Sequence, residues 1–214
     1  MKRIIVLPLL IWSFYAMAQD STHLPSEKHS QKGFEKDRLF TGGSLTAGFS
    51  NYVTVLGLSP QFGYSLTHWA DAGITLNFNY TSQRDYINYG DKLRQTVYGP
   101  GAFLRLFPVN FLFASAQYEF NWIHLNYIPA PNTATVSTKT NVNASSLLLG
   151  LGYAGGRYPG SNSYYYFSVS WDVLAEPNSP YVDGLGRSNP VFRVGYNIGL
   201  FQGGGARRYR NYGQ

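Results

Sequence analysis

The last apolar segment of the chain alternates strictly between apolar and small or polar positions. Its apolar positions are Phe192, Val194, Tyr196, Ile198 and Leu200, and they alternate with Arg193, Gly195, Asn197 and Gly199. Because successive side chains of a β-strand point to opposite faces, this pattern predicts a two-faced strand. A soluble sandwich would bury the apolar face, whereas a transmembrane barrel would turn it toward lipid and the polar face toward the lumen.

Seven similar segments precede this one, separated by turn residues. They cover residues 44–50, 53–66, 73–80, 98–106, 112–122, 146–153 and 164–173. Eight is the smallest usual number of strands in a transmembrane barrel. An even number of strands returns both chain termini to the same side of the membrane. The pattern therefore predicts an all-β fold: an eight-stranded antiparallel transmembrane β-barrel with an up-and-down meander.

The connections between these segments differ in length. The shorter set lies at residues 68–71, 108–110 and 155–163, and the longer set at 82–91, 128–143 and 175–189, with a tight first connection near Asn51. Short periplasmic turns and longer outer loops are typical of membrane barrels. Aromatic residues predicted at the strand ends, where rings prefer the lipid headgroup level, are Tyr80, Trp122, Tyr127, Trp171 and Phe192 on the outer side and Trp69, Phe107 and Phe201 on the inner side.

The N-terminus has the pattern of a secretory signal peptide. Lys2 and Arg3 precede an apolar run from Ile4 to Tyr15 and the small-residue cleavage site Ala16-Met17-Ala18. We therefore expect a signal peptide at 1–18, a polar periplasmic leader at 19–38, the barrel at 39–201 and a basic, Gly-rich C-terminal tail at 202–214.

Composition favours the membrane interpretation over a secreted sandwich. Charged residues are only 13% of the chain, against about 25% in soluble domains, while aromatic residues reach 17% and the mean hydropathy is -0.21. Cysteine is absent, which excludes disulfides and thiolate metal sites. The net charge of +6 does not form a stripe along one element, so we expect no nucleic acid partner and instead lipopolysaccharide or anionic lipid.

The segment from Tyr52 to Thr67, followed by residues 69–74 (WADAGI), resembles the small outer-membrane β-barrel proteins common in Bacteroidota, of the OmpA and porin type. The resemblance covers about residues 41–201. It implies a bacterial outer-membrane location and recognition of the terminal strand by the barrel-assembly machinery. Such proteins usually end at the terminal aromatic residue, whereas this chain continues to Gln214.

Four charged residues fall on the predicted lumen side: Arg105, Glu119, Asp172 and Arg193. An eight-stranded barrel is just wide enough for side chains to fill it, and buried charges are costly unless they are paired. We therefore expect an interior polar network, with Arg193 directed toward Asp172, and a closed lumen. The alternative is a narrow passive channel.

Candidate chemistry is sparse. His124 shares the outward face with Trp122, where some outer-membrane enzymes modify lipids, but Ser115 and Glu119 on the same strand face inward and cannot join it. We predict no catalytic, cofactor or metal site. The sequence thus indicates a non-enzymatic structural or accessory subunit of a cell-envelope complex, whose loops or tail bind another envelope protein. A passive channel is the first alternative, and a lipid-modifying enzyme is the second.

Overall fold

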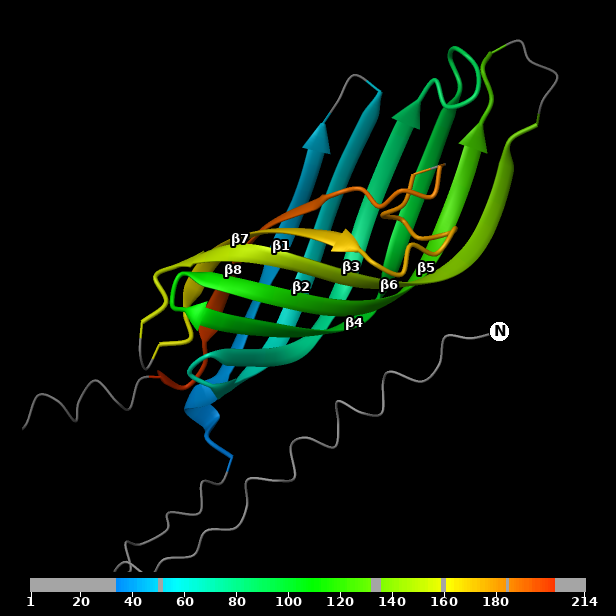
Figure 1. The fold of residues 1–214 in the computed structure, drawn as a ribbon. Coiled ribbons are helices and arrows are strands. Elements are labelled where there is room, and N and C mark those ends of the chain that lie inside the picture. Colours follow the sequence, from blue (N-terminus) through cyan, green and yellow to red (C-terminus); the bar gives the residue numbers. More distant parts are fainter. Residues whose placement is uncertain (1–33, 50–51, 132–135, 159–160, 184, 203–214) are drawn as a thin grey trace, which may run out of the picture. The chain divides into compact units, whose positions relative to one another are not determined.

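The structure, a computed structural model, describes residues 34–49, 52–131, 136–158, 161–183 and 185–202. The predicted signal peptide, most of the predicted leader and nearly all of the predicted tail lie outside these residues. A short 3-10 helix, η2 (Lys36–Arg38), precedes the strands (Figure 1). The eight strands are β1 (Leu39–Phe49), β2 (Val53–Thr67), β3 (Ala70–Arg84), β4 (Lys92–Val109), β5 (Leu112–Ile128), β6 (Thr138–Gly155), β7 (Tyr164–Asp172) and β8 (Val191–Gly199).

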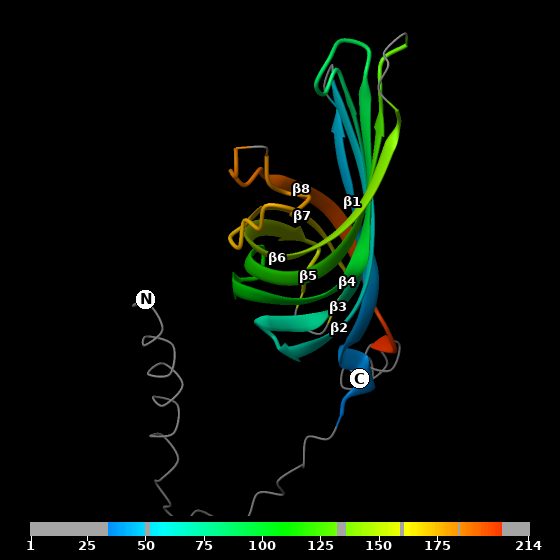
Figure 2. The same cartoon turned by 90° about the vertical axis from the view of Figure 1, so that its right-hand side faces the viewer.

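The strands form one closed barrel in which each strand pairs antiparallel with the next and β8 returns to β1. The closing seam runs from the pair Phe40 and Gly199 to the pair Leu45 and Val194. Figure 2 shows the sheet curling into this ring. The predicted eight-stranded antiparallel meander is therefore confirmed, and the closed ring excludes a two-sheet sandwich. We call the end where β1 begins and β8 ends the inner end, and the opposite end the outer end.

Several strands extend further than the alternating pattern indicates. The loop expected at 128–143 is shorter, because β5 continues to Ile128 and β6 begins at Thr138, with Tyr127 paired to Thr138. In the same way β4 begins at Lys92, directly after the loop expected at 82–91. Polar side chains on both faces hide these extensions from the sequence pattern, whereas backbone hydrogen bonds continue the ladder regardless of side-chain polarity.

Strands β7 and β8 stop well short of the outer ends of β4, β5 and β6 (Figure 1). The last residue of β7, Asp172, is opposite Leu148, so the described pairing leaves residues 138–147 of β6 without a strand partner on that side. The connection between β7 and β8 therefore starts and ends closer to the inner end than the outer ends of β4, β5 and β6 do. It buries Ser179 and Tyr181, which makes it a structural part of the barrel interior.

Over most of their length the outward faces of the strands are apolar and exposed. On β8 they carry Phe192, Val194, Tyr196 and Ile198, each at least half exposed, whereas Leu200 lies beyond the end of the strand and is half-buried. Trp69, Trp122 and Trp171 are exposed as well. Two predicted rim aromatics instead point inward: Phe107 is buried in the barrel core and the hydroxyl of Tyr127 bonds to Asp91. No helix among the described residues has the length and apolar character needed to cross a membrane.

Candidate functional site

The interior of the barrel contains a buried ion pair toward its outer half. Arg193 on β8 donates to the carboxylate of Glu119 on β5 at 2.8 Å, and both side chains are almost fully buried. Tyr181, from the connection between β7 and β8, donates to the same carboxylate at 2.7 Å and accepts from Arg193 at 3.3 Å. Gln117 and Asn121 also donate to Glu119. We call Glu119, Arg193 and Tyr181 the outer cluster.

The expected pairing of Arg193 with Asp172 is wrong. Asp172 ends β7 and accepts hydrogen bonds from the backbone of Leu147 and Leu174 and from the hydroxyl of Ser179. The register explains the difference, because Arg193 lies opposite Ser168, four residues along β7 from Asp172. Asp172 therefore holds the connection between β7 and β8 against β6 and does not balance an arginine.

A second set of charges fills the inner half. Arg105 on β4 donates to Gln61 at 2.8 Å and to the hydroxyl of Tyr164 at 3.3 Å. Tyr164 in turn donates to Asp71 at 3.0 Å, and Arg157 lies 3.4 Å from the same carboxylate. We call Arg105, Tyr164, Asp71 and Arg157 the inner cluster.

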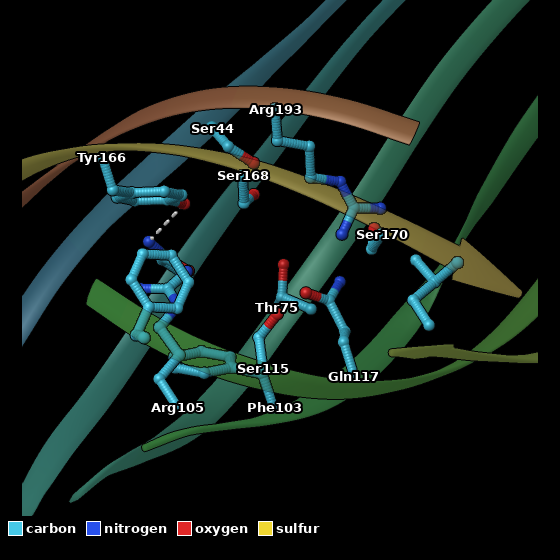
Figure 3. A pocket seen from close by; sticks show the side chains of 13 residues that line it. Ser44, Thr75, Phe103, Arg105, Ser115, Gln117, Tyr166, Ser168, Ser170 and Arg193 are labelled. Carbon is cyan, nitrogen blue, oxygen red and sulfur yellow. Dashed lines mark hydrogen bonds between the residues drawn. The ribbon is translucent and has the colours of Figure 1, made fainter. Parts of the chain in front are cut away.

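Aromatic rings surround the two arginines of the inner cluster. The guanidinium of Arg105 lies 4.2 Å from the ring centroid of Tyr166 and 4.7 Å from that of Phe103. Figure 3 shows Arg105 beneath Tyr166, with Phe103 beside it. Arg157 lies 3.8 Å from the ring centroid of Phe107. Cation–π contacts of this kind stabilise a desolvated guanidinium.

All four predicted lumen charges are buried. Arg105 belongs to the inner cluster, Glu119 and Arg193 belong to the outer cluster, and Asp172 lies in the wall beside β6.

The sequence pattern missed Asp71, Arg157 and Tyr181. Asp71 was assigned to a turn, although it continues the inward alternation of Gly73 and Thr75 on β3. Arg157 and Tyr181 lie in connections, where alternation carries no signal.

The space left between the two clusters is small. It is an enclosed cavity of about 20 Å³, lined among others by Ser44, Thr75, Ser168 and Arg193 (Figure 3). This volume suits about one water molecule. Within the described residues, the side chain of Asn77 is fully buried and neither of its polar atoms has a protein partner. The interior is therefore polar and suited to isolated water molecules, and it is too narrow at this level for a hydrated solute.

His124 lies on the outside of the barrel. Its Nδ1 is 2.5 Å from the side-chain oxygen of Asn141, its Nε2 is 3.1 Å from the hydroxyl of Tyr98, and its ring stacks on Tyr98. Ser115 lines the interior cavity and Glu119 belongs to the outer cluster. The wall of the barrel separates these groups from His124, so they cannot form one nucleophile, base and orienting group.

The hairpin tip between β3 and β4 is organised by Asp91. Its carboxylate accepts from the backbone N–H groups of Tyr86, Ile87 and Asn88 and from the hydroxyl of Tyr127. Burial acts to raise the pKa of Asp91, but these donors outweigh it and hold the pKa below its usual value. The described residues contain no group of three or more metal-ligating side chains.

Comparisons with known proteins give only weak similarity, and it is to solved structures. No family model and no curated protein matches the chain. Among solved structures, the chain is similar to the crystal structure of Neisserial surface protein A, with a TM-score of 0.37 and 10% sequence identity over 76% of this chain and 96% of that chain.

Proposed function

We propose that the protein is a bacterial outer-membrane β-barrel that acts as a closed, non-enzymatic anchor in the cell envelope. The observation that carries the proposal is the distribution of polarity. Apolar side chains cover the outside of the barrel, while the interior holds Arg105, Glu119 and Arg193. This is the reverse of a water-soluble barrel and is typical of a membrane barrel.

The height of the apolar surface supports this location. On β5 the outward positions from Leu112 to Trp122 are all apolar or aromatic. Ten residues of strand span about 33 Å, which corresponds to a depth of about 25 Å at a strand tilt of about 40°. That depth matches the apolar band of outer-membrane barrels. We call this surface the apolar belt.

The membrane location can be tested with tryptophan fluorescence. Trp69, Trp122 and Trp171 are the tryptophans that follow the predicted signal peptide, and all three are exposed on the outside of the barrel. The refolded protein should be strongly quenched in vesicles of brominated phospholipid and unquenched in vesicles of the unbrominated lipid. Emission that is equal in the two lipids would contradict the membrane location.

We further propose that the protein serves as an accessory subunit through the hairpin tip between β3 and β4. The tip exposes Tyr86, Ile87 and Tyr89, with Tyr89 92% exposed. Asp91 and Asp85 hold the backbone of this tip through hydrogen bonds. A rigid loop with exposed aromatic residues loses little conformational entropy when it binds, which favours a role in protein recognition.

Co-purification tests the accessory role. The double variant Tyr86→Ser/Tyr89→Ser should lose any envelope protein that co-purifies with the wild type from solubilised outer membranes. Tyr158→Ser, which changes a tyrosine that is 70% exposed in the connection between β6 and β7, is the matched control and should retain it. Retention of the same partner by the double variant would argue against the tip, and a parallel deletion of residues 202–214 would then test the tail.

A further inference from the structure

Charged side chains in the strands separate by face and by sign. Those that face the interior include both acids and bases. Those that face outward are all basic and exposed, and all lie toward the outer end: Arg84, Lys92, Arg94 and Lys139. The described strands place no carboxylate on the outside, so every charge on the strand surface near this end is positive.

Two of these residues are brought together by the register of three neighbouring strands. Arg94 on β4 lies opposite Asn126 on β5, and Asn126 lies opposite Lys139 on β6. Because neighbouring strands are about 5 Å apart, the Cα atoms of Arg94 and Lys139 are separated by about 10 Å. Two long cationic side chains can reach one small anion across that distance. They border a shallow groove of about 380 Å³ that also includes Tyr80, Thr96 and His124.

The floor of this groove is fixed by hydrogen bonds. His124 contacts both Asn141 and Tyr98, and its ring stacks on Tyr98 with 5.4 Å between centroids. Within the described residues, neither Arg94 nor Lys139 belongs to an ion pair. Both charges are therefore available to a ligand, and the polar surface beneath them is already ordered.

The groove lies directly beyond the apolar belt. Tyr98 and Trp122 are opposite one another, and Arg94 follows four residues further toward the outer end, or about 13 Å along the strand. In the membrane orientation of the proposed function, on which this step rests, Arg94 and Lys139 lie at the level of lipid headgroups. A ligand that places acyl chains on the belt would bring its phosphate to them.

We propose that Arg94 and Lys139, with Asn126 between them, bind the phosphate group of an outer-leaflet lipid whose acyl chains lie against Tyr98 and Trp122. Guanidinium and ammonium groups are the side chains suited to phosphate, and Asn126 supplies an additional amide donor. The site positions a lipid at one sector of the barrel, over β4, β5 and β6.

Equilibrium binding to the purified full-length protein in detergent micelles tests this site, with fluorescently labelled diphosphoryl lipid A and its dephosphorylated form as probes. The wild type should bind the phosphorylated form about tenfold more tightly, since each charge-assisted hydrogen bond is strong. The variant Arg94→Gln/Lys139→Gln should lose this preference. The control Lys36→Gln/Arg187→Gln removes the same charge from two other exposed positions and should keep it.

Three results would overturn the site: an unchanged preference in the Arg94→Gln/Lys139→Gln variant, an equal loss in the control, or displacement of the lipid by an equal concentration of inorganic phosphate. The last would indicate a site for free phosphate. Heat-dependent migration on gels verifies that each variant forms the barrel. Brominated-lipid quenching of the same variants separates the two proposals, because intact quenching without phosphate preference refutes the lipid site alone.

Discussion

Glu119 has four donors and one full counter-charge in the outer cluster, so removal of Arg193 leaves a buried carboxylate without its cation. Breaking a buried pair in this way costs about 3–5 kcal/mol. We expect Arg193→Met to lower the free energy of unfolding by that amount. The double variant Glu119→Gln/Arg193→Met should recover much of the loss, because the introduced amide is uncharged and its oxygen can still accept from Tyr181.

Urea unfolding in detergent micelles or lipid vesicles measures both variants. Asp183 and Arg187 form an exposed pair at 2.9 Å and provide the control, because Arg187→Gln should leave the unfolding midpoint almost unchanged. If Arg193→Met unfolds at the same urea concentration as the wild type, the outer cluster does not stabilise the barrel.

Asp91 makes the order of the hairpin tip between β3 and β4 dependent on pH. Because its folded pKa lies below the usual value, the stabilisation is fully present above the ordinary carboxyl pKa and is lost as pH falls through the lowered value. Amide exchange at Tyr86, Ile87 and Asn88, corrected for the intrinsic rate, should show protection at pH 7 that declines below about pH 4.

Asp91→Asn should remove most of this protection already at pH 7, while exchange in the barrel strands stays unchanged. Equal protection of the tip in wild type and variant at pH 7 would mean that backbone contacts alone hold the loop.

Alternation was sufficient to place Arg105, Glu119, Asp172 and Arg193 inside the barrel, because the side-chain period of a strand fixes the face. It did not identify which charges meet. Arg193 contacts Glu119 from the far side of the lumen, and that contact depends on strand register and barrel curvature, which no local pattern records.

At the level of elements, the seam between β1 and β8 depends on close backbone approach at Gly42. A Cβ at this position would overlap the carbonyl oxygen of Tyr196 and contact Asn197. Gly42→Val should therefore destabilise the closed barrel by about 1–3 kcal/mol. Gly48→Val is the control on the same strand, where the nearest atom is Val55 Cβ at 3.7 Å.

Heat-dependent gel migration and urea unfolding report on the seam. The Gly42 variant should show less of the folded form and a lower midpoint, and the Gly48 variant should resemble the wild type. Identical behaviour of all three proteins would show that the seam tolerates a side chain at residue 42.

The strands could be predicted wherever one face is continuously apolar, as on β3 from Ile74 to Tyr80. Their outer extensions could not, since residues such as Thr140 and Asn141 on β6 are polar on both faces and form strand only through pairing with β5. The inward path of the connection between β7 and β8 was also unpredictable, because it depends on hydrogen bonds from Ser179 and Tyr181 to charges on other strands.

At the level of the whole molecule, the two clusters lie in series along the lumen, and the closed lumen that we propose rests on both of them. The outer cluster uses Tyr181 from a connection, whereas the inner cluster uses side chains of β3, β4 and β7 with Arg157. Replacing residues 175–189 with a short Gly-Ser linker should remove Tyr181 from the outer cluster and leave the inner cluster in place. The shortened protein should therefore remain impermeable to ions.

Planar-bilayer conductance of the full-length protein tests the central claim most directly, with insertion checked separately by brominated-lipid quenching. A barrel closed by both clusters should give no discrete current steps under an applied voltage, while a wide porin in the same apparatus gives large ones. Stable, reproducible steps from inserted wild-type protein would contradict the closed-lumen account and establish a passive channel.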